Sequence, residues 1–67
     1  MPFRFAVISR DGDVFDSFES SVPDWNVGDP VILAGNRRYR VTGTIPVDRI
    51  AEFVDGPVYG VLEVEPQ

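Results

Sequence analysis

Polar and apolar residues alternate over residues 38–45 with the two-residue period of a β-strand that has one buried face. The alternation predicts two faces, with Arg38, Arg40, Thr42 and Thr44 on one and Tyr39, Val41, Gly43 and Ile45 on the other. The apolar residues 31–34 are expected to form the preceding strand of the same hairpin. A four-residue loop pairs Ile32 with Val41, whereas a two-residue turn pairs Ile32 with Tyr39, and both registers agree with the alternation.

A second hairpin is predicted at the start of the chain. Residues 3–10 and 13–19 read as strands on either side of Asp11-Gly12, a dipeptide that favours a two-residue turn. Such a turn predicts two pairs of opposite charge and two apolar pairs, all of which stabilise sheets. The expected pairs are Arg4 with Glu19, Arg10 with Asp13, Phe5 with Phe18, and Ile8 with Phe15.

Residues 20–30 are rich in Ser, Pro, Asp and Gly, which indicates a loop. Its apolar residues, Trp25 and Val27, are expected to pack over one end of the core. Asp29 stands between a glycine and a proline, where its carboxylate is expected to cap backbone amides of the loop.

The remaining elements are one helix and one strand. Apolar residues recur at helical spacing over 47–54, after a proline and before a Gly-Pro pair. Residues 58–65 are expected to form the last strand. The sequence therefore predicts a mainly-β fold, namely a small five-stranded antiparallel barrel of SH3-like or similar type with one short helix at about 47–54. Closure into a barrel would hide the strand edges.

All 67 residues are expected to form a single domain, because no linker or change of composition divides them. A chain of this length buries only about 60% of the surface that its unfolded form exposes. Disulfides cannot add stability, since the chain has no Cys. We therefore expect a homo-oligomer, in which a second copy supplies further burial.

The chain has no Lys, His or Cys, and its six cationic side chains are all Arg. The usual general base, thiol nucleophile, Schiff-base amine and commonest metal ligands are thus missing. We expect no enzymatic activity, no cofactor and no metal site. Three carboxylates near the first turn, Asp11, Asp13 and Asp16, do not supply the shaped loop of about six oxygen ligands that calcium needs.

The net charge of −5 favours solubility and opposes non-specific binding to nucleic acid or anionic lipid. No apolar run approaches the roughly 20 residues of a membrane span, and the first residues lack the apolar stretch of a secretory signal. A cytoplasmic location is therefore expected, with no membrane partner.

The run Arg37-Arg38-Tyr39-Arg40 is the first candidate binding site. Three guanidiniums and a ring can hold phosphates and stack a base. However, strand alternation sends Tyr39 to the opposite face from Arg38 and Arg40, and the net charge opposes nucleic-acid binding. The alternatives are a protein partner, solvated side chains, or ion pairs with acidic residues of the last strand, Glu63 and Glu65.

The second candidate site is aromatic and consists of Trp25, Tyr39 and Tyr59. Aromatic side chains with a polar tip are enriched at recognition sites. Two of them side by side on the surface would form a peptide groove of the kind found in SH3-like modules. The alternative is that these rings form a lid on the core.

Four segments carry a resemblance that extends over the whole chain. They are the opening Phe-Arg-Phe strand, residues 22–29, the run 37–41 and residues 61–66, and their most specific feature is Trp25-x-x-Gly28-Asp29 before an Arg-rich strand. The chain resembles a group of short proteins common in high-GC actinobacteria, and Gly28-Asp29 before a strand is also similar to SH3-like barrels. That group has no assigned activity, so the resemblance implies no functional residues.

These observations favour a non-enzymatic binding or structural module that self-associates and recognises protein. The alternative is an adaptor that binds phosphate or nucleic acid through Arg37, Arg38 and Arg40. The identity of the partner and the number of subunits do not follow from the residues.

Overall fold

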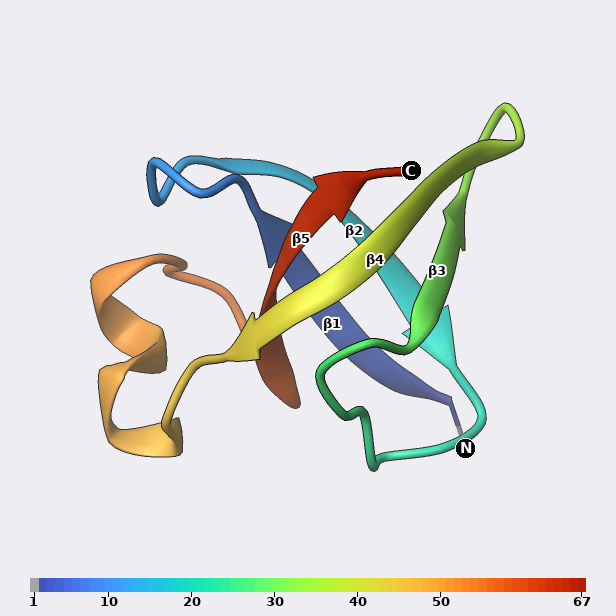
Figure 1. Ribbon diagram of the computed structural model, residues 1–67. Coiled ribbons are helices and arrows are strands. Elements are labelled where there is room, and N and C mark those ends of the chain that lie inside the picture. The colour runs from blue at the N-terminus through green and yellow to red at the C-terminus, as the bar shows by residue number, and fades with distance from the viewer. Residues whose placement is uncertain (1) are drawn as a thin grey trace.

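The computed structural model describes residues 2–67. Within them the chain forms five strands and one short 3₁₀-helix, in the order β1 (Phe3–Ile8), β2 (Val14–Ser20), β3 (Pro30–Leu33), β4 (Arg37–Thr44), η1 (Val47–Glu52) and β5 (Gly60–Pro66). The strands make one curled sheet in the order β2-β1-β5-β4-β3 (Figure 1). The prediction of a mainly-β fold with one short helical segment is confirmed.

The predicted antiparallel closed barrel is wrong. The central strand β5 runs parallel to its neighbour β1, and the other pairs are antiparallel. The sheet remains a half-barrel whose edges are β2 and β3. Residues 5–8 of β1 are all buried, so this strand is covered on both faces, as parallel strands usually are.

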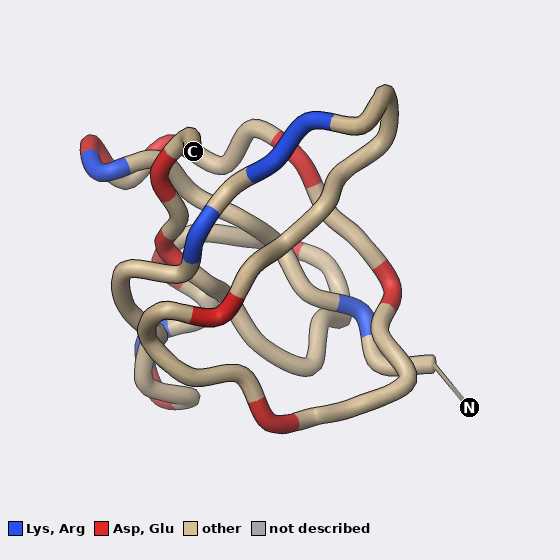
Figure 2. The backbone as a smooth tube through the Cα atoms, turned by 45° about the vertical axis from the view of Figure 1, so that its right-hand side comes forward, with Lys and Arg blue, Asp and Glu red and all other residues tan. Residues whose placement is uncertain are grey.

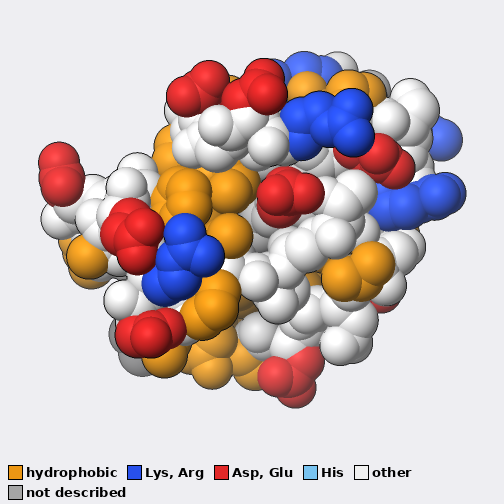
Figure 3. Space-filling model, turned by 60° about the vertical axis from the view of Figure 1, so that its left-hand side comes forward, with side chains coloured by type: hydrophobic (Ala, Val, Ile, Leu, Met, Phe, Trp, Pro, Cys, Tyr) orange, Lys and Arg blue, Asp and Glu red, His pale blue; other side chains and the backbone are white. Residues whose placement is uncertain are grey.

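Each face of the sheet carries its own hydrophobic core. The inner core contains Phe5, Val7, Val31, Leu33, Val41, Leu62 and Val64. The outer core contains Ala6, Ile8 and Val61 and is covered by apolar side chains of residues 45–58. On the side of the molecule that carries η1, hydrophobic side chains form a band with acidic and basic side chains beside it (Figure 3). The segment between β4 and β5 therefore serves mainly as the cover of the outer face.

The first hairpin has the predicted register over most of its length. Arg4 lies opposite Glu19 and Phe5 lies opposite Phe18. A bulge then shifts the register, so that Ile8 pairs with Val14 and the predicted pair with Phe15 is wrong.

The connection in this hairpin is longer than the predicted two-residue turn. The backbone N–H of Ser9 donates to the Asp13 carbonyl at 3.0 Å, and that of Gly12 donates to the Ser9 carbonyl at 2.9 Å. Gly12 has a φ of +89°, a conformation that suits glycine. Arg10 and Asp13 consequently lie in the loop and do not form the predicted strand pair.

The second hairpin adopts neither predicted register. Val31 pairs with Tyr39 and Leu33 with Arg37, which leaves a loop of three residues, 34–36. Both Gly35 (φ +79°) and Asn36 (φ +60°) in this loop have positive φ. The predicted faces of β4 are nevertheless confirmed up to Val41. Val41, on the predicted apolar face, is buried in the inner core, whereas Arg38 and Arg40, on the predicted polar face, are exposed.

The helical segment is shorter than predicted, and its apolar face is confirmed only in part, since Ile50 and Val54 pack on the outer core whereas Val47 and Ala51 are exposed. The 3₁₀-helix covers Val47–Glu52, and no side chain caps its start at Pro46. Ile50 and Phe53 pack on the outer core, because residues three apart align in a 3₁₀-helix. Val47, expected on the buried face, is 82% exposed.

Candidate functional site

A cleft of about 500 Å³ opens at the end of the half-barrel where β4 ends and β5 begins. The loop between β2 and β3 contributes one wall through residues 23–26. Residues 44–45 and 59–62 contribute the other, and Phe5 of β1 lies between them. In Figure 1 these segments meet at the lower edge of the molecule. The cleft therefore brings together four parts of the chain that are far apart in sequence.

Two of the predicted aromatic residues, Trp25 and Tyr59, converge at this cleft. The Phe5 ring is buried, and its centroid lies 6.3 Å from the ring of Trp25 and 5.6 Å from the ring of Tyr59, both in edge-to-face geometry. Such arrangements are the preferred contacts of aromatic pairs. The predicted Trp25–Tyr59 surface is thus organised by Phe5, which sequence reasoning placed only in the core.

Trp25 is held by a loop that is bonded at its far end to the sheet. The carboxylate of Asp29 accepts a hydrogen bond from the Asn26 backbone N–H at 2.8 Å, which confirms the predicted amide cap. The Gly28 N–H donates to the Val41 carbonyl at 2.8 Å, and Gly28 adopts a φ of +98°. These bonds fix the position of the loop against β4.

The Trp25 ring is also packed from the sheet side. It lies edge-to-face on Phe18, with ring centroids 5.4 Å apart. Its indole N–H is buried and has no hydrogen-bond acceptor among the described residues. Trp25 therefore contributes to the core with one part and to the cleft wall with another.

Tyr59 owes its position to its neighbour Gly60. A Cβ atom on Gly60 would lie only 3.0 Å from Cε1 of Phe5, so glycine is the residue that permits this close approach of β5 to the Phe5 ring. The Tyr59 N–H donates to the Arg4 carbonyl at 2.7 Å. With its backbone fixed in this way, the Tyr59 side chain stays 55% exposed beside the cleft.

The lining of the cleft is mixed in polarity. Its rings and aliphatic groups are accompanied by the polar side chains of Asn26 and Thr44. Among residues 2–67, Asp24 is the one charged residue of the lining. The cleft thus offers apolar and hydrogen-bonding groups together with a single carboxylate.

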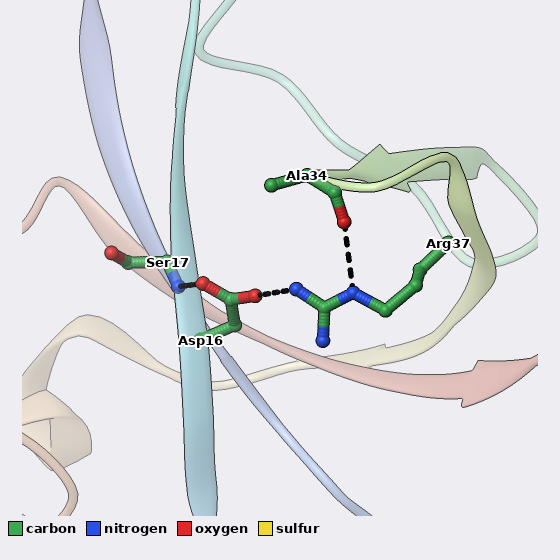
Figure 4. Close-up of polar contacts among 4 residues, drawn as sticks. All are labelled: Asp16, Ser17, Ala34 and Arg37. Atoms are coloured by element: carbon green, nitrogen blue, oxygen red, sulfur yellow. Dashed lines mark hydrogen bonds and ion pairs between the residues drawn. The ribbon is translucent and has the colours of Figure 1, made fainter.

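The arginine run does not act as one surface. Arg37 pairs with the carboxylate of Asp16 in β2, and its Nε donates to the Ala34 carbonyl at 2.9 Å (Figure 4). Asp16 also accepts the Ser17 backbone N–H at 2.8 Å. The Ser17 N–H and the Arg37 guanidinium hold the pKa of the Asp16 carboxyl below its usual value. Arg37 is therefore occupied in a structural contact.

Arg38 and Arg40 lie on the outer face of β4 and are exposed. Figure 2 shows this basic stretch as blue segments along the chain from the hairpin tip. Arg40 lies opposite Glu65 across the β4–β5 ladder, but neither arginine forms an ion pair within residues 2–67. Glu63 instead accepts a hydrogen bond from the Thr42 hydroxyl at 2.9 Å.

Tyr39 lies apart from the other two predicted aromatic residues. Its ring centroid is 5.5 Å from that of Phe15 in β2, and it contributes nothing to the lining of the cleft. This contact crosses the open side of the half-barrel, as the pair of Arg37 with Asp16 does. Tyr39 is therefore better described as part of the seam between β4 and β2.

In the part of the chain that the structure describes, no group of three or more His, Cys, Asp or Glu side chains is placed to hold a metal ion. Within the same residues, 2–67, no helix has the length and apolar character needed to cross a membrane.

Comparison with known proteins adds no relative. No family model, curated protein or solved structure matches this chain. The resemblances to the actinobacterial group and to SH3-like barrels therefore stay predictions, and the function has to be argued from the cleft itself.

Proposed function

We propose that this chain is a protein-recognition module whose binding site is the Trp25–Tyr59 cleft. The observation that carries the proposal is the convergence of these two rings on Phe5 at the mouth of a cleft of about 500 Å³. Tyr and Trp are the residues most enriched at the centres of protein interfaces, where they bury large area at small cost in conformational entropy.

The lining supports a peptide segment as the occupant. Exposed apolar side chains beside a hollow are typical of interaction surfaces, and Tyr59, which lines the cleft, is 55% exposed. The polar lining residues Asp24, Asn26 and Thr44 accompany the rings. We assign the cleft to an extended segment of a partner protein, which can use apolar and hydrogen-bonding contacts together.

The β4 arginines support the alternative, a phosphate or nucleic-acid adaptor, less well. Phosphate recognition needs guanidiniums that converge on one point. Arg37 is paired with Asp16, and Arg40 lies beside Glu65, so the three guanidiniums do not converge. We therefore place the binding site in the cleft and not on β4.

The proposal is tested by selection from a displayed library of random peptides. The wild type is expected to enrich a set of sequences, and Tyr59→Ser is expected to weaken their binding about tenfold or more, because it removes a central ring. Ile32→Ser is the matched control, since Ile32 is 64% exposed and lies outside this cleft. Circular dichroism checks that both variants fold.

Two results would count against the proposal. One is the absence of any enriched sequence with folded wild-type protein. The other is equal binding of the enriched peptides by the wild type and by Tyr59→Ser, which would place their site elsewhere on the molecule.

A further inference from the structure

We infer that the segment bound in the Trp25–Tyr59 cleft is positively charged, and that it places an arginine or lysine next to Asp24. This inference rests on the proposed function and adds the chemistry of the partner to it. It follows from the position of Asp24 in the cleft lining and from the lack of arginines there among residues 2–67.

The charge at the cleft is negative. Asp24 is exposed in one wall and, among residues 2–67, is the one Asp, Glu or Arg residue that lines the cleft. Its carboxylate forms no ion pair within the same residues. A bound cation would therefore meet a carboxylate that has no partner of its own.

None of the six arginines, all of which the structure describes, lines the cleft. Arg37 pairs with Asp16 and Arg49 pairs with Glu52. Arg4 lies on the face of β1 opposite to Phe5, Arg10 lies in the β1–β2 loop, and Arg38 and Arg40 are on the outer face of β4. A positively charged ligand would therefore meet no arginine in the lining.

The aromatic walls add a second attraction for a cation. An arginine or lysine over the face of a Trp or Tyr ring is attracted by the ring quadrupole, and most strongly where water is excluded. Guanidinium can stack on a ring and bind a carboxylate at the same time, whereas ammonium acts as a point charge. Trp25 and Asp24 are adjacent in the same wall, which favours arginine over lysine.

The net charge of the whole protein also favours the binding of a basic partner. Its net charge of −5 attracts a basic segment at long range and raises the association rate, an effect that salt weakens. An acidic segment would be repelled by the same field. Charge complementarity thus selects a basic partner both on approach and at the site.

The test uses the peptides enriched from the random library. We expect arginine or lysine to be over-represented in them relative to the unselected library. In the peptide that binds most tightly, replacement of its basic residues by Gln is expected to weaken binding, and replacement by Glu is expected to weaken it further. Affinity is also expected to fall between about 50 mM and about 300 mM NaCl, because these charges are exposed.

A matched pair of protein variants locates the effect. Asp24→Asn is expected to weaken the basic peptide about threefold or more. Asp11→Asn makes the same change of net charge in the exposed β1–β2 loop, far from the cleft lining, and is expected to leave the affinity nearly unchanged. Equal effects of the two variants would show a contribution of net charge alone and would overturn the placement next to Asp24.

The two proposals fail in different ways. If no peptide is enriched, the proposed recognition function is wrong. If neutral or acidic peptides are enriched, bind in a manner that depends on Tyr59 and do not respond to Asp24→Asn, the recognition function stands and the inference of a basic partner is wrong.

Discussion

The guanidinium of Arg37 in β4 pairs with the carboxylate of Asp16 in β2, two residues separated by 21 positions, and so bridges the open side of the half-barrel. No backbone ladder joins β2 to β3 or β4. The contact between the rings of Phe15 and Tyr39 crosses the same seam. Side-chain contacts thus join β2 to β4 across the side where a closed barrel would have a strand pair.

This bridge predicts a specific dependence of stability on pH. The pKa of Asp16 is lowered in the folded protein from its ordinary value of 3.8. The ionised Asp16 carboxylate, held by the Ser17 backbone N–H and by Arg37, therefore stabilises the fold fully above pH 3.8, and this contribution is lost as the pH falls through the lower pKa of the folded protein. At pH 7, Asp16→Asn is expected to have a lower melting temperature than the wild type. This difference in melting temperature is expected to shrink as the pH falls below 3.8.

Thermal denaturation at several pH values measures this difference. Asp13→Asn serves as the control, because Asp13 is exposed and forms no side-chain ion pair within residues 2–67. If the difference in melting temperature between the wild type and Asp16→Asn stays constant down to strongly acidic pH, the ion pair does not cause that difference.

The inner core predicts the cost of a cavity. Val41 is fully buried in β4, and Val41→Ala is expected to lower the free energy of unfolding by about 2 kcal/mol through lost transfer energy and an unfilled void. For a domain of this size that corresponds to a fall of about 8 °C or more in the melting temperature. Val27→Ala, at an exposed site, is expected to change stability by less than about 0.5 kcal/mol. Equal losses for the two variants would contradict the assigned core.

The close approach at Gly60 predicts a combined effect on stability and binding. In Gly60→Ala the new Cβ would lie 3.0 Å from Cε1 and 3.2 Å from Cδ1 of Phe5. The ring has to shift, at a cost of about 1–3 kcal/mol, and the Trp25–Tyr59 surface shifts with it. We expect a lower melting temperature, a changed near-ultraviolet circular dichroism spectrum and weaker peptide binding.

Gly56→Ala provides the comparison for this substitution. Nothing lies within 4 Å of a Cβ built on Gly56, and its φ is outside the positive range. It is expected to leave stability unchanged or slightly increased. Should Gly60→Ala behave in the same way, the Phe5–Gly60 contact would not determine the shape of the cleft.

Self-association remains a prediction that follows from the small size of the chain. The chain has a mass of 7.5 kDa and no disulfide, so burial against a second copy is an available source of stability. Sedimentation equilibrium at micromolar concentration is expected to show species larger than a monomer. A single 7.5 kDa species across the concentration range would exclude the prediction.

The faces of the strands could be predicted from the sequence, but their registers only in part. Alternation correctly separates Val41 from Arg40, and the turn residues correctly set Arg4 against Glu19. In the first hairpin the error begins at the bulge beside Ile8, because one extra residue in a strand leaves no mark in the local pattern. In the second hairpin the error comes from the length of the loop, which is three residues. The parallel pairing of β1 with β5 depends on contacts between distant parts of the chain, which a local pattern does not contain.

The residues of the candidate site could likewise be predicted from the sequence only by type, and their arrangement in space could not. Trp25 and Tyr59 could be singled out by residue type, but their meeting depends on Phe5 lying beside Gly60 in the β1–β5 pair. That pair joins residues from opposite ends of the sequence. The third aromatic candidate, Tyr39, has the same chemistry and is carried by its strand to the other side of the molecule.

The β1–β5 pair also has a consequence for how the protein is made. Among residues 2–67 it is the only backbone ladder that joins the N-terminal hairpin to the rest of the sheet. While the chain is still being translated, residues 5–8 of β1 have no partner on one edge until β5 leaves the ribosome. Closing so long a loop is slow compared with local pairing. The sheet therefore cannot be completed before β5 has been made, and the apolar β1 is open to chaperones or to aggregation until then.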